Sequence, residues 1–136
     1  MIALVDTNVV LDVLLDRAPF ALASASVLAG IESSRAQGLL CATTVTTIHY
    51  IAERSIGATA SRLRIGNLLA VFGVAPVNGA ALEAAIASPI KDFEDAVLHE
   101  SAIRAGADCI VTRNTVDFSL SQIPVYTPAQ AVQAMA

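Results

Sequence analysis

Four acidic residues of this 136-residue chain lie beside apolar stretches, where they could bind a cation together. Asp6 ends the apolar run that opens the chain, and Asp117 follows the apolar run 109–112 after a short polar stretch. Asp92 and Asp95 begin a helical stretch and lie on one face of it, being three residues apart. Carboxylates held within a few ångströms repel one another, and such a set can serve as the ligands of a hard divalent cation, which relieves the repulsion.

Each of these acids also has an ordinary structural explanation. Asp6 and Asp92 can cap the helices that follow them. Asp95, in a first helical turn, suits the positive helix end by about 0.3–1 kcal/mol. Asp117 can form a turn. For one acid taken alone the structural interpretation is favoured, whereas a carboxylate at each of these boundaries favours a metal site.

Strand and helix signals alternate along the chain and predict an α/β fold. We expect strands in 2–6, 39–43, 74–76, 109–112 and 124–127, and helices in 8–15, 20–36, 45–56, 59–71, 78–87, 93–105 and after Thr127-Pro128. Asp6 or Thr7, Thr59, Asn78, Asp92 and Thr127 are the expected helix caps. This alternation is typical of βαβ units. We therefore expect a single domain, 1–136, with a three-layer α/β/α fold and a central, mostly parallel sheet of four or five strands.

The expected sheet also predicts where the acids lie. Sites in open α/β sheets form outside the carboxyl ends of the strands, where the strand order reverses. If strands 2–6 and 109–112 are neighbours, Asp6 and Asp117 converge at that edge. The helix from Asp92 can bring its first turn to the same place.

Composition limits the classes of function. Hydrophobic residues make up 55% of the chain and mean hydropathy is +0.65, which fits a sheet covered on both faces. The net charge of −4 argues against tight, non-specific duplex binding, while nucleic acid could still bind through a cation. No continuous apolar helix of about 20 residues and no signal peptide is expected. We therefore expect a cytoplasmic protein without a membrane segment.

The apolar excess also predicts a homodimer, with helices 45–56 and 59–71 as candidate interfaces. Cys41 and Cys109 lie in separate apolar runs and form no CxxC pair. We expect both to be buried, reduced thiols.

Two segments, "ALVDTNVVLDVL" and "KDFEDAVLHESAIRAGADCIVTRNTVDF", resemble the PIN domain family, many of whose members are VapC-type ribonuclease toxins of toxin–antitoxin pairs. The resemblance runs from Ile2 to the terminal helix. It implies a parallel sheet flanked by helices, an acidic pocket that binds Mg²⁺ or Mn²⁺, RNA as the substrate and an antitoxin as a possible partner.

The resemblance also implies roles for individual residues. Asp6, Asp95 and Asp117 match the family's metal-binding acids, and Asp92 is often acidic in this subgroup. Asn8 and Thr112 match polar residues that hold those carboxylates, and Asn114 stands where other members carry a ligand.

One position departs from the family pattern. After the second strand the family usually has an acid, and "VTTIHY" places His49 there. Glu53 lies four residues further on the same helical face and is a candidate substitute. Histidine is a poor ligand for Mg²⁺, so we expect metal affinity or activity to be reduced. Which of the two replaces the acid is left open.

The expected chemistry is metal-dependent phosphodiester hydrolysis, with Arg113 in contact with a phosphate. An aspartyl-phosphate phosphatase is the rival enzyme class, but it needs an acid two residues after Asp6, where this chain has Asn8. The alternative of another class is a catalytically weakened PIN-like domain that binds nucleic acid or protein.

Overall fold

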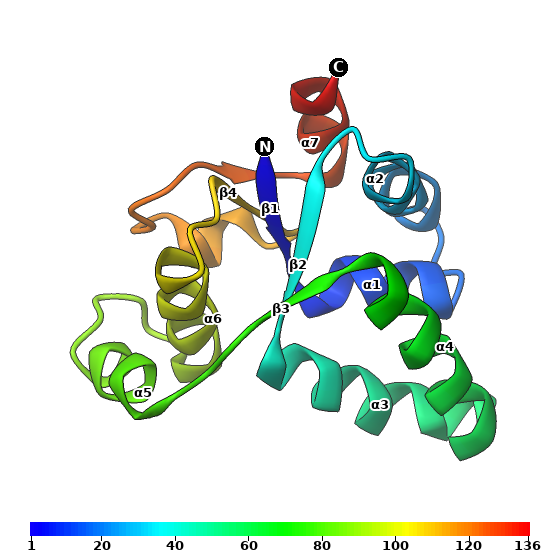
Figure 1. Cartoon of the computed structure of the whole chain (residues 1–136), viewed down its shortest axis with the longest axis horizontal. Helices are drawn as coiled ribbons and strands as arrows, with labels where there is room; N and C mark the ends of the chain where they lie inside the picture. Colours follow the sequence, from blue (N-terminus) through cyan, green and yellow to red (C-terminus); the bar gives the residue numbers. More distant parts are fainter.

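A computed structural model describes residues 1–136 and has one five-stranded, all-parallel sheet in the order β3-β2-β1-β4-β5 (Figure 1). The strands are β1 (Ile2–Val5), β2 (Gln37–Cys41), β3 (Gly73–Ala75), β4 (Cys109–Val111) and β5 (Val125–Tyr126). The helices are α1 (Thr7–Leu14), α2 (Ala21–Glu32), α3 (Ala42–Ile56), α4 (Ala58–Val71), α5 (Gly79–Ile86), α6 (Phe93–Arg104) and α7 (Pro128–Met135), with a 3₁₀ turn η1 (Thr115–Phe118).

Two hydrophobic clusters cover the two faces of the sheet. Ala3 and Val5 of β1 belong to one cluster and Leu4 between them to the other, because successive strand side chains point to opposite faces. The first cluster draws on α1, α2, α3, α4 and α7, and the second on α5 and α6. Figure 1 shows α5 and α6 on one side of the strands and α1 to α4 on the other. The predicted three-layer α/β/α fold is confirmed.

β1 lies between β2 and β4, which confirms the expected pairing of the first strand with residues 109–112. Leu4 pairs with Ile110 and Val5 with Val111, and the Asp6 amide continues the ladder by donating to the Val111 carbonyl at 2.9 Å. The chain passes from β1 to β2 and β3 on one side, and then crosses back to β4 on the other. The strand order therefore reverses beside the carboxyl end of β1, which is where ligands bind in such sheets.

The helix boundaries follow local capping with one exception among the expected caps. Asn78, Asp92 and Thr127 accept hydrogen bonds from the first turns of α5, α6 and α7, as predicted. The Asp6 side chain accepts from the Thr7 amide, so β1 ends one residue earlier than expected. The prediction for Thr59 is wrong, because α4 already begins at residue 58, after Gly57, whose φ of +84° favours glycine.

Two smaller expectations can be compared with the structure. Cys41 and Cys109 are both buried and unbridged, as predicted. No helix combines the length and the apolar character needed to cross a bilayer.

Candidate functional site

The carboxylate of Asp6 lies at the end of β1 and is held by three hydrogen bonds. Its Oδ1 accepts from the Thr7 amide at 2.7 Å, and its Oδ2 accepts from Thr112 Oγ1 at 2.8 Å and from Asn8 Nδ2 at 3.2 Å. The side chain is 7% exposed. A carboxylate oxygen has two lone pairs, so Oδ2 is fully used while Oδ1 keeps one lone pair for a further ligand.

Asn8 and Thr112 also fix the chain that follows β4. The Asn8 Oδ1 accepts from the Arg113 amide at 3.1 Å, and the Thr112 hydroxyl accepts from the Asn114 amide at 3.0 Å. The Asn114 backbone is thereby held beside the residues that bind Asp6. Both Asn8 and Thr112 thus contact the carboxylate that the sequence predicts they support.

Asp92, Asp95 and Asp117 line one pocket of about 450 Å³ between the first turn of α6 and η1. Asp92 caps α6 by accepting from the Asp95 amide at 2.9 Å. The remaining wall contains Lys91 and several other residues of the segments 89–92 and 116–120. The structure therefore brings three of the four candidate acids to one cavity. Asp6 does not line this pocket, but its negative charge contributes to the raised pKa of Asp95.

The carboxylates of the site destabilise one another's charge. Burial raises the pKa of Asp95 from 3.8 to about 7, with smaller contributions from the negative charges of Asp92, Asp6 and Asp117. Burial also raises the pKa of Asp6, against hydrogen bonds from Thr112 and Thr7. Because neighbouring negative charges disfavour the ionised forms of Asp6 and Asp95, a divalent cation would be attracted to the group.

Glu94 belongs to the same electrostatic group, and the sequence reasoning missed it. Its charge raises the pKa of both Asp6 and Asp95. It lies in the first turn of α6, between Asp92 and Asp95 in the sequence. The signal that could have found it is the run of three acids within four residues, from Asp92 to Asp95.

The donor chemistry of the site fits a hard cation, although the side chains do not form a closed ligand set. Carboxylate oxygens from Asp6, Asp95 and Asp117 are the ligands that Mg²⁺ and Mn²⁺ prefer. No group of three acidic, histidine or cysteine side chains in the chain is placed to hold a metal ion. The residues therefore fit a hard cation in type, while their side chains are not placed as a complete ligand set.

His49 contacts α4 and Glu53, and neither His49 nor Glu53 forms a hydrogen bond with Asp6. His49 Nδ1 is 2.8 Å from the hydroxyl of buried Ser61 on α4, and its Nε2 is 3.3 Å from Glu53 Oε2. Thr44 of α3 contacts the first residue of α1, next to Asp6: its hydroxyl accepts from Thr7 Oγ1 at 3.3 Å. His49 therefore joins two helices, and α3 presents threonine to the site.

The Arg113 guanidinium binds Asp12, and Arg113 does not line the acidic pocket. Arg113 Nε and Nη2 lie 2.5 and 3.1 Å from the two oxygens of that fully buried carboxylate, and the guanidinium stacks on Phe20. A phosphate would have to compete with this pair for the guanidinium. The basic residue that lines the acidic pocket is Lys91, which forms no ion pair.

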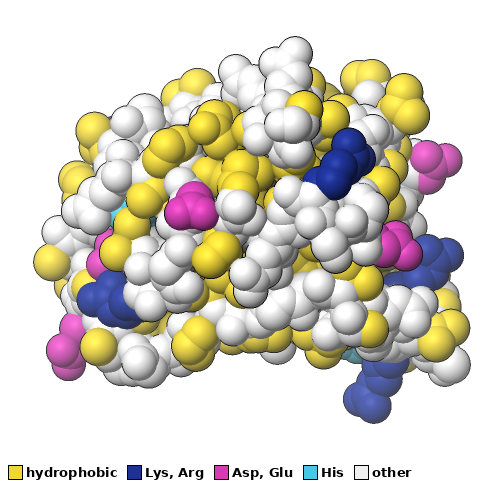
Figure 2. All heavy atoms as spheres, turned by 45° about the horizontal axis from the view of Figure 1, so that its top comes forward, with side chains coloured by type: hydrophobic (Ala, Val, Ile, Leu, Met, Phe, Trp, Pro, Cys, Tyr) yellow, Lys and Arg dark blue, Asp and Glu magenta, His cyan; other side chains and the backbone are white.

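Charged side chains do not gather into a basic surface on the face drawn in Figure 2, where hydrophobic side chains surround isolated acidic and basic ones. This view has the side with both chain termini turned forward. On that face, the molecule offers no continuous track of positive charge for a nucleic acid.

The all-parallel sheet and the acids at its carboxyl edge define the class of fold, and a comparison of sequences gives the family. The PIN domain family matches residues 3–116, so the chain belongs to the PIN domain family. A comparison with curated proteins gives no match.

Solved structures with similar folds include several toxin–antitoxin proteins. A chain of VapBC2 from Rickettsia felis, bound to a promoter DNA fragment, is 12% identical with a TM-score of 0.70, covering 93% of this chain and 98% of that one. A toxin–antitoxin complex from Klebsiella pneumoniae is 22% identical with a TM-score of 0.69, covering 93% and 97%. The sarcin–ricin-loop-cleaving toxin VapC20 from Mycobacterium tuberculosis is 14% identical with a TM-score of 0.65, covering 79% and 86%. At these identities the likeness is one of fold.

Proposed function

We propose that this protein is a divalent-metal-dependent ribonuclease that hydrolyses RNA phosphodiester bonds. The observation that carries the proposal is the placement of Asp95 beside the strand reversal, in one pocket with Asp92 and Asp117, where burial and then the negative charges of Asp92, Asp6 and Asp117 raise its pKa to about 7. Acids with raised pKa values beside a pocket favour a functional site over unrelated structural roles for each acid. Membership of the PIN domain family and the fold shared with a toxin that cleaves RNA support the same function.

In this proposal Asp6, Asp95 and Asp117 hold Mg²⁺ or Mn²⁺, with Asp92 adding negative charge. When bound, such a cation lowers the pKa of a water molecule and stabilises charge on the attacked phosphate. Asn8 and Thr112 keep the Asp6 carboxylate oriented through Oδ2, which leaves a lone pair of Oδ1 for a ligand. The carboxylates also explain why RNA would need the cation, since they repel phosphate on their own.

Lys91 is the residue we propose as a phosphate contact at this pocket. Its ammonium group is exposed and lines the same cavity as Asp95 and Asp117. Arg113, the contact expected from the sequence, is bound to Asp12. A single lysine at the rim fits the acidic net charge, because binding would rely on the cation and few direct phosphate contacts.

We also propose that the protein is the toxin of a toxin–antitoxin pair, works in the cytoplasm and forms a homodimer. The toxin–antitoxin complexes among the similar folds support an antitoxin partner. Tyr50 on α3 and Leu63 and Leu69 on α4 are exposed apolar side chains on the two helices expected at the dimer interface. Light scattering should therefore report a dimer, and a monomer at high micromolar concentration would count against it.

A second candidate is a PIN domain that binds nucleic acid or protein without cleaving. Two observations favour it: the α3 residue that contacts Thr7, next to Asp6, is a threonine and not an acid, and no three metal-binding side chains are already in place. The two candidates differ in whether a divalent ion binds and supports cleavage.

The test is an RNA cleavage assay with the wild type, Asp6→Asn and Asp16→Asn, each with Mg²⁺, Mn²⁺ or a chelator. Asp16 is an exposed acid beyond the end of α1 with φ of +48°, which asparagine tolerates, so this variant is a control for the loss of one charge. Cleavage by wild type and Asp16→Asn, but not by Asp6→Asn or with chelator, supports the proposal. RNA binding without cleavage in any metal favours the binding module, and neither binding nor cleavage contradicts both.

A further inference from the structure

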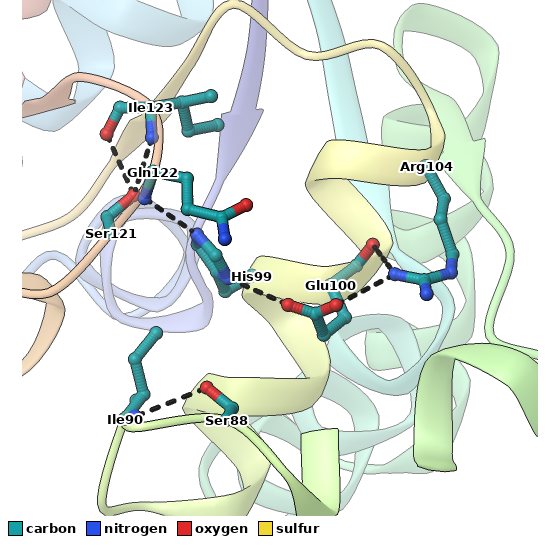
Figure 3. Close-up of polar contacts among 8 residues, drawn as sticks. All are labelled: Ser88, Ile90, His99, Glu100, Arg104, Ser121, Gln122 and Ile123. Carbon is teal, nitrogen blue, oxygen red and sulfur yellow. Dashed lines mark hydrogen bonds and ion pairs between the residues drawn. The ribbon is translucent and has the colours of Figure 1, made fainter. Parts of the chain in front are cut away.

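His99 is a buried histidine on α6, one helical turn after Asp95, with defined partners on both ring nitrogens (Figure 3). Nε2 is 3.0 Å from the backbone nitrogen of Gln122, and Nδ1 is 3.1 Å from Glu100 Oε2. A backbone amide only donates, so Nε2 is the acceptor and the ring proton lies on Nδ1, from which it is donated to Glu100.

Glu100 keeps the ring in this tautomer. Burial alone would raise the pKa of Glu100, but hydrogen bonds from Arg104 and His99 outweigh this and lower it. The Arg104 Nη1 lies 2.9 Å from the other carboxylate oxygen. The carboxylate is thus ionised and oriented, and it holds the Nδ1 proton so that Nε2 stays free to accept.

The bond from Gln122 is the only hydrogen bond that joins residues 115–123 to another helix or strand. The other hydrogen bonds of this segment stay local, such as those between Ser121 and Ile123 and from the Ser119 amide to Val116. Figure 3 shows the turn around Ser121 and Gln122 lying against the His99 ring. The polar attachment of the whole segment to α6 is therefore this one contact.

The same segment carries Asp117 and part of the pocket wall. Asp117 lies in η1, and Ser119 and Leu120, which follow it, line the pocket together with Asp95. Phe118 is buried among the side chains of α6, which anchors the start of the segment by apolar packing. His99 anchors its end.

We infer that His99 is a positioning residue that holds Asp117 across the pocket from Asp95 by accepting the Gln122 amide. The inference rests on the proposed function, because the position of Asp117 matters to chemistry only if the pocket acts on RNA. His99 itself contacts neither the pocket nor its acids through any hydrogen bond, so it acts through the segment.

Two matched variants separate this role from simple packing. In His99→Gln the terminal amide reaches the position of Nε2 and its oxygen can accept from Gln122. In His99→Asn the shorter amide reaches only the position of Nδ1, towards Glu100. Each variant loses the ring and keeps one of the two polar contacts, so a packing defect alone affects both alike.

The first readout is amide hydrogen exchange across residues 115–123 in the full, metal-free chain. We expect His99→Asn to exchange roughly 5- to 10-fold faster than wild type at Gln122, the equivalent of one hydrogen bond, and His99→Gln to stay close to wild type. The second readout is RNA cleavage, where His99→Asn should lower kcat by roughly 10- to 100-fold through misplacement of an acid, with KM little changed. His99→Gln should retain most of kcat.

Equal losses in both variants, or unchanged exchange in His99→Asn, would overturn the inference. Should a variant fail to fold, the nitrogen chemical shifts of the wild-type His99 imidazole decide instead. A ring proton on Nδ1 supports the hydrogen bond from the Gln122 amide to Nε2, and a ring proton on Nε2 contradicts it. If wild type cleaves no RNA, the proposed function fails, while the exchange data still show whether His99 holds the segment.

Discussion

Asp12 and Arg113 are 101 positions apart in sequence and form a buried, two-bond ion pair. The Asp12 side chain is fully buried, and Arg17 adds a third contact at 3.8 Å. The pair joins α1 to the residue that follows Thr112, which itself binds Asp6. Because an unpaired buried carboxylate is costly, the Asp12–Arg113 pair holds the residue after Thr112 against α1, next to the hydrogen bonds that hold Asp6.

The first prediction is that Arg113→Ala lowers the free energy of unfolding by about 3 kcal/mol, because Asp12 remains buried with only the distant Arg17. Arg113→Lys should lose less, since lysine keeps a charge but makes no two-bond contact. Urea denaturation measures both, and Arg62→Ala, a change at an exposed residue of α4, is the control. Wild-type stability combined with weaker RNA binding in Arg113→Ala would instead support the phosphate contact expected from the sequence.

The second prediction is that Asp6→Asn abolishes metal binding and leaves the fold intact. Asparagine can still accept from the Thr7 amide, since Asn and Asp cap helices about equally well. What disappears is a buried negative charge that a divalent ion needs. Thermal melts should show that Mn²⁺ stabilises the wild type and not the variant, which still melts cooperatively without metal. A variant that keeps the Mn²⁺ shift would show that Asp6 is only a helix cap.

The third prediction concerns pH. Burial and neighbouring acids raise the pKa of Asp95 from 3.8 to about 7 in the folded chain. A carboxyl with a raised folded pKa stabilises the fold while protonated, so this contribution is complete below about pH 4 and is lost as pH rises through 7. We expect on the order of 1–2 kcal/mol, because the group is partly exposed and solvent screens its neighbours.

Asp95→Asn isolates this contribution. The metal-free variant should lose less stability than the wild type between pH 4 and pH 8 in denaturant titrations. Mn²⁺ should bind the wild type more tightly as pH rises through 7, because the ion displaces the Asp95 proton. Parallel pH profiles of the two proteins would contradict the raised pKa.

The sequence predicts the sheet and the Asp6 end of the site because these depend on local signals. The strand that ends in Asp6 and the apolar run 109–112 are visible as hydrophobic patterns, and pairing them places Thr112 beside Asp6. The Asp12–Arg113 pair is not visible, since its partners are distant in sequence and Asp12 lies within an apolar helix. Local patterns likewise miss the Gln122 contact of His99, which depends on how a loop folds back on α6.

The phase of α3 bears on the expectation for His49, which stays a prediction. Position after a strand does not say which face of a helix meets the site, because the helix turns by about 100° per residue. The tertiary contact between Thr7 and Thr44 sets that phase here. His49, five residues after Thr44, is rotated towards α4 and binds Ser61.

The last prediction follows from this phase. Thr47 lies one turn after Thr44 on the same face of α3, and it is partly exposed, whereas Thr44 is fully buried and could not accept a charge cheaply. Thr47→Glu should therefore extend a fourth carboxylate towards Asp6 and raise Mn²⁺ affinity, by several-fold or more.

His49→Glu should leave Mn²⁺ affinity unchanged and lower the free energy of unfolding by about 1 kcal/mol, because it removes the bond to Ser61 and places a negative charge next to Glu53. Calorimetric Mn²⁺ titration of the two variants and wild type makes the comparison, with Thr47→Gln as the uncharged control. If His49→Glu raises affinity and Thr47→Glu does not, the face of α3 assigned to the site is wrong and the original expectation for His49 is right.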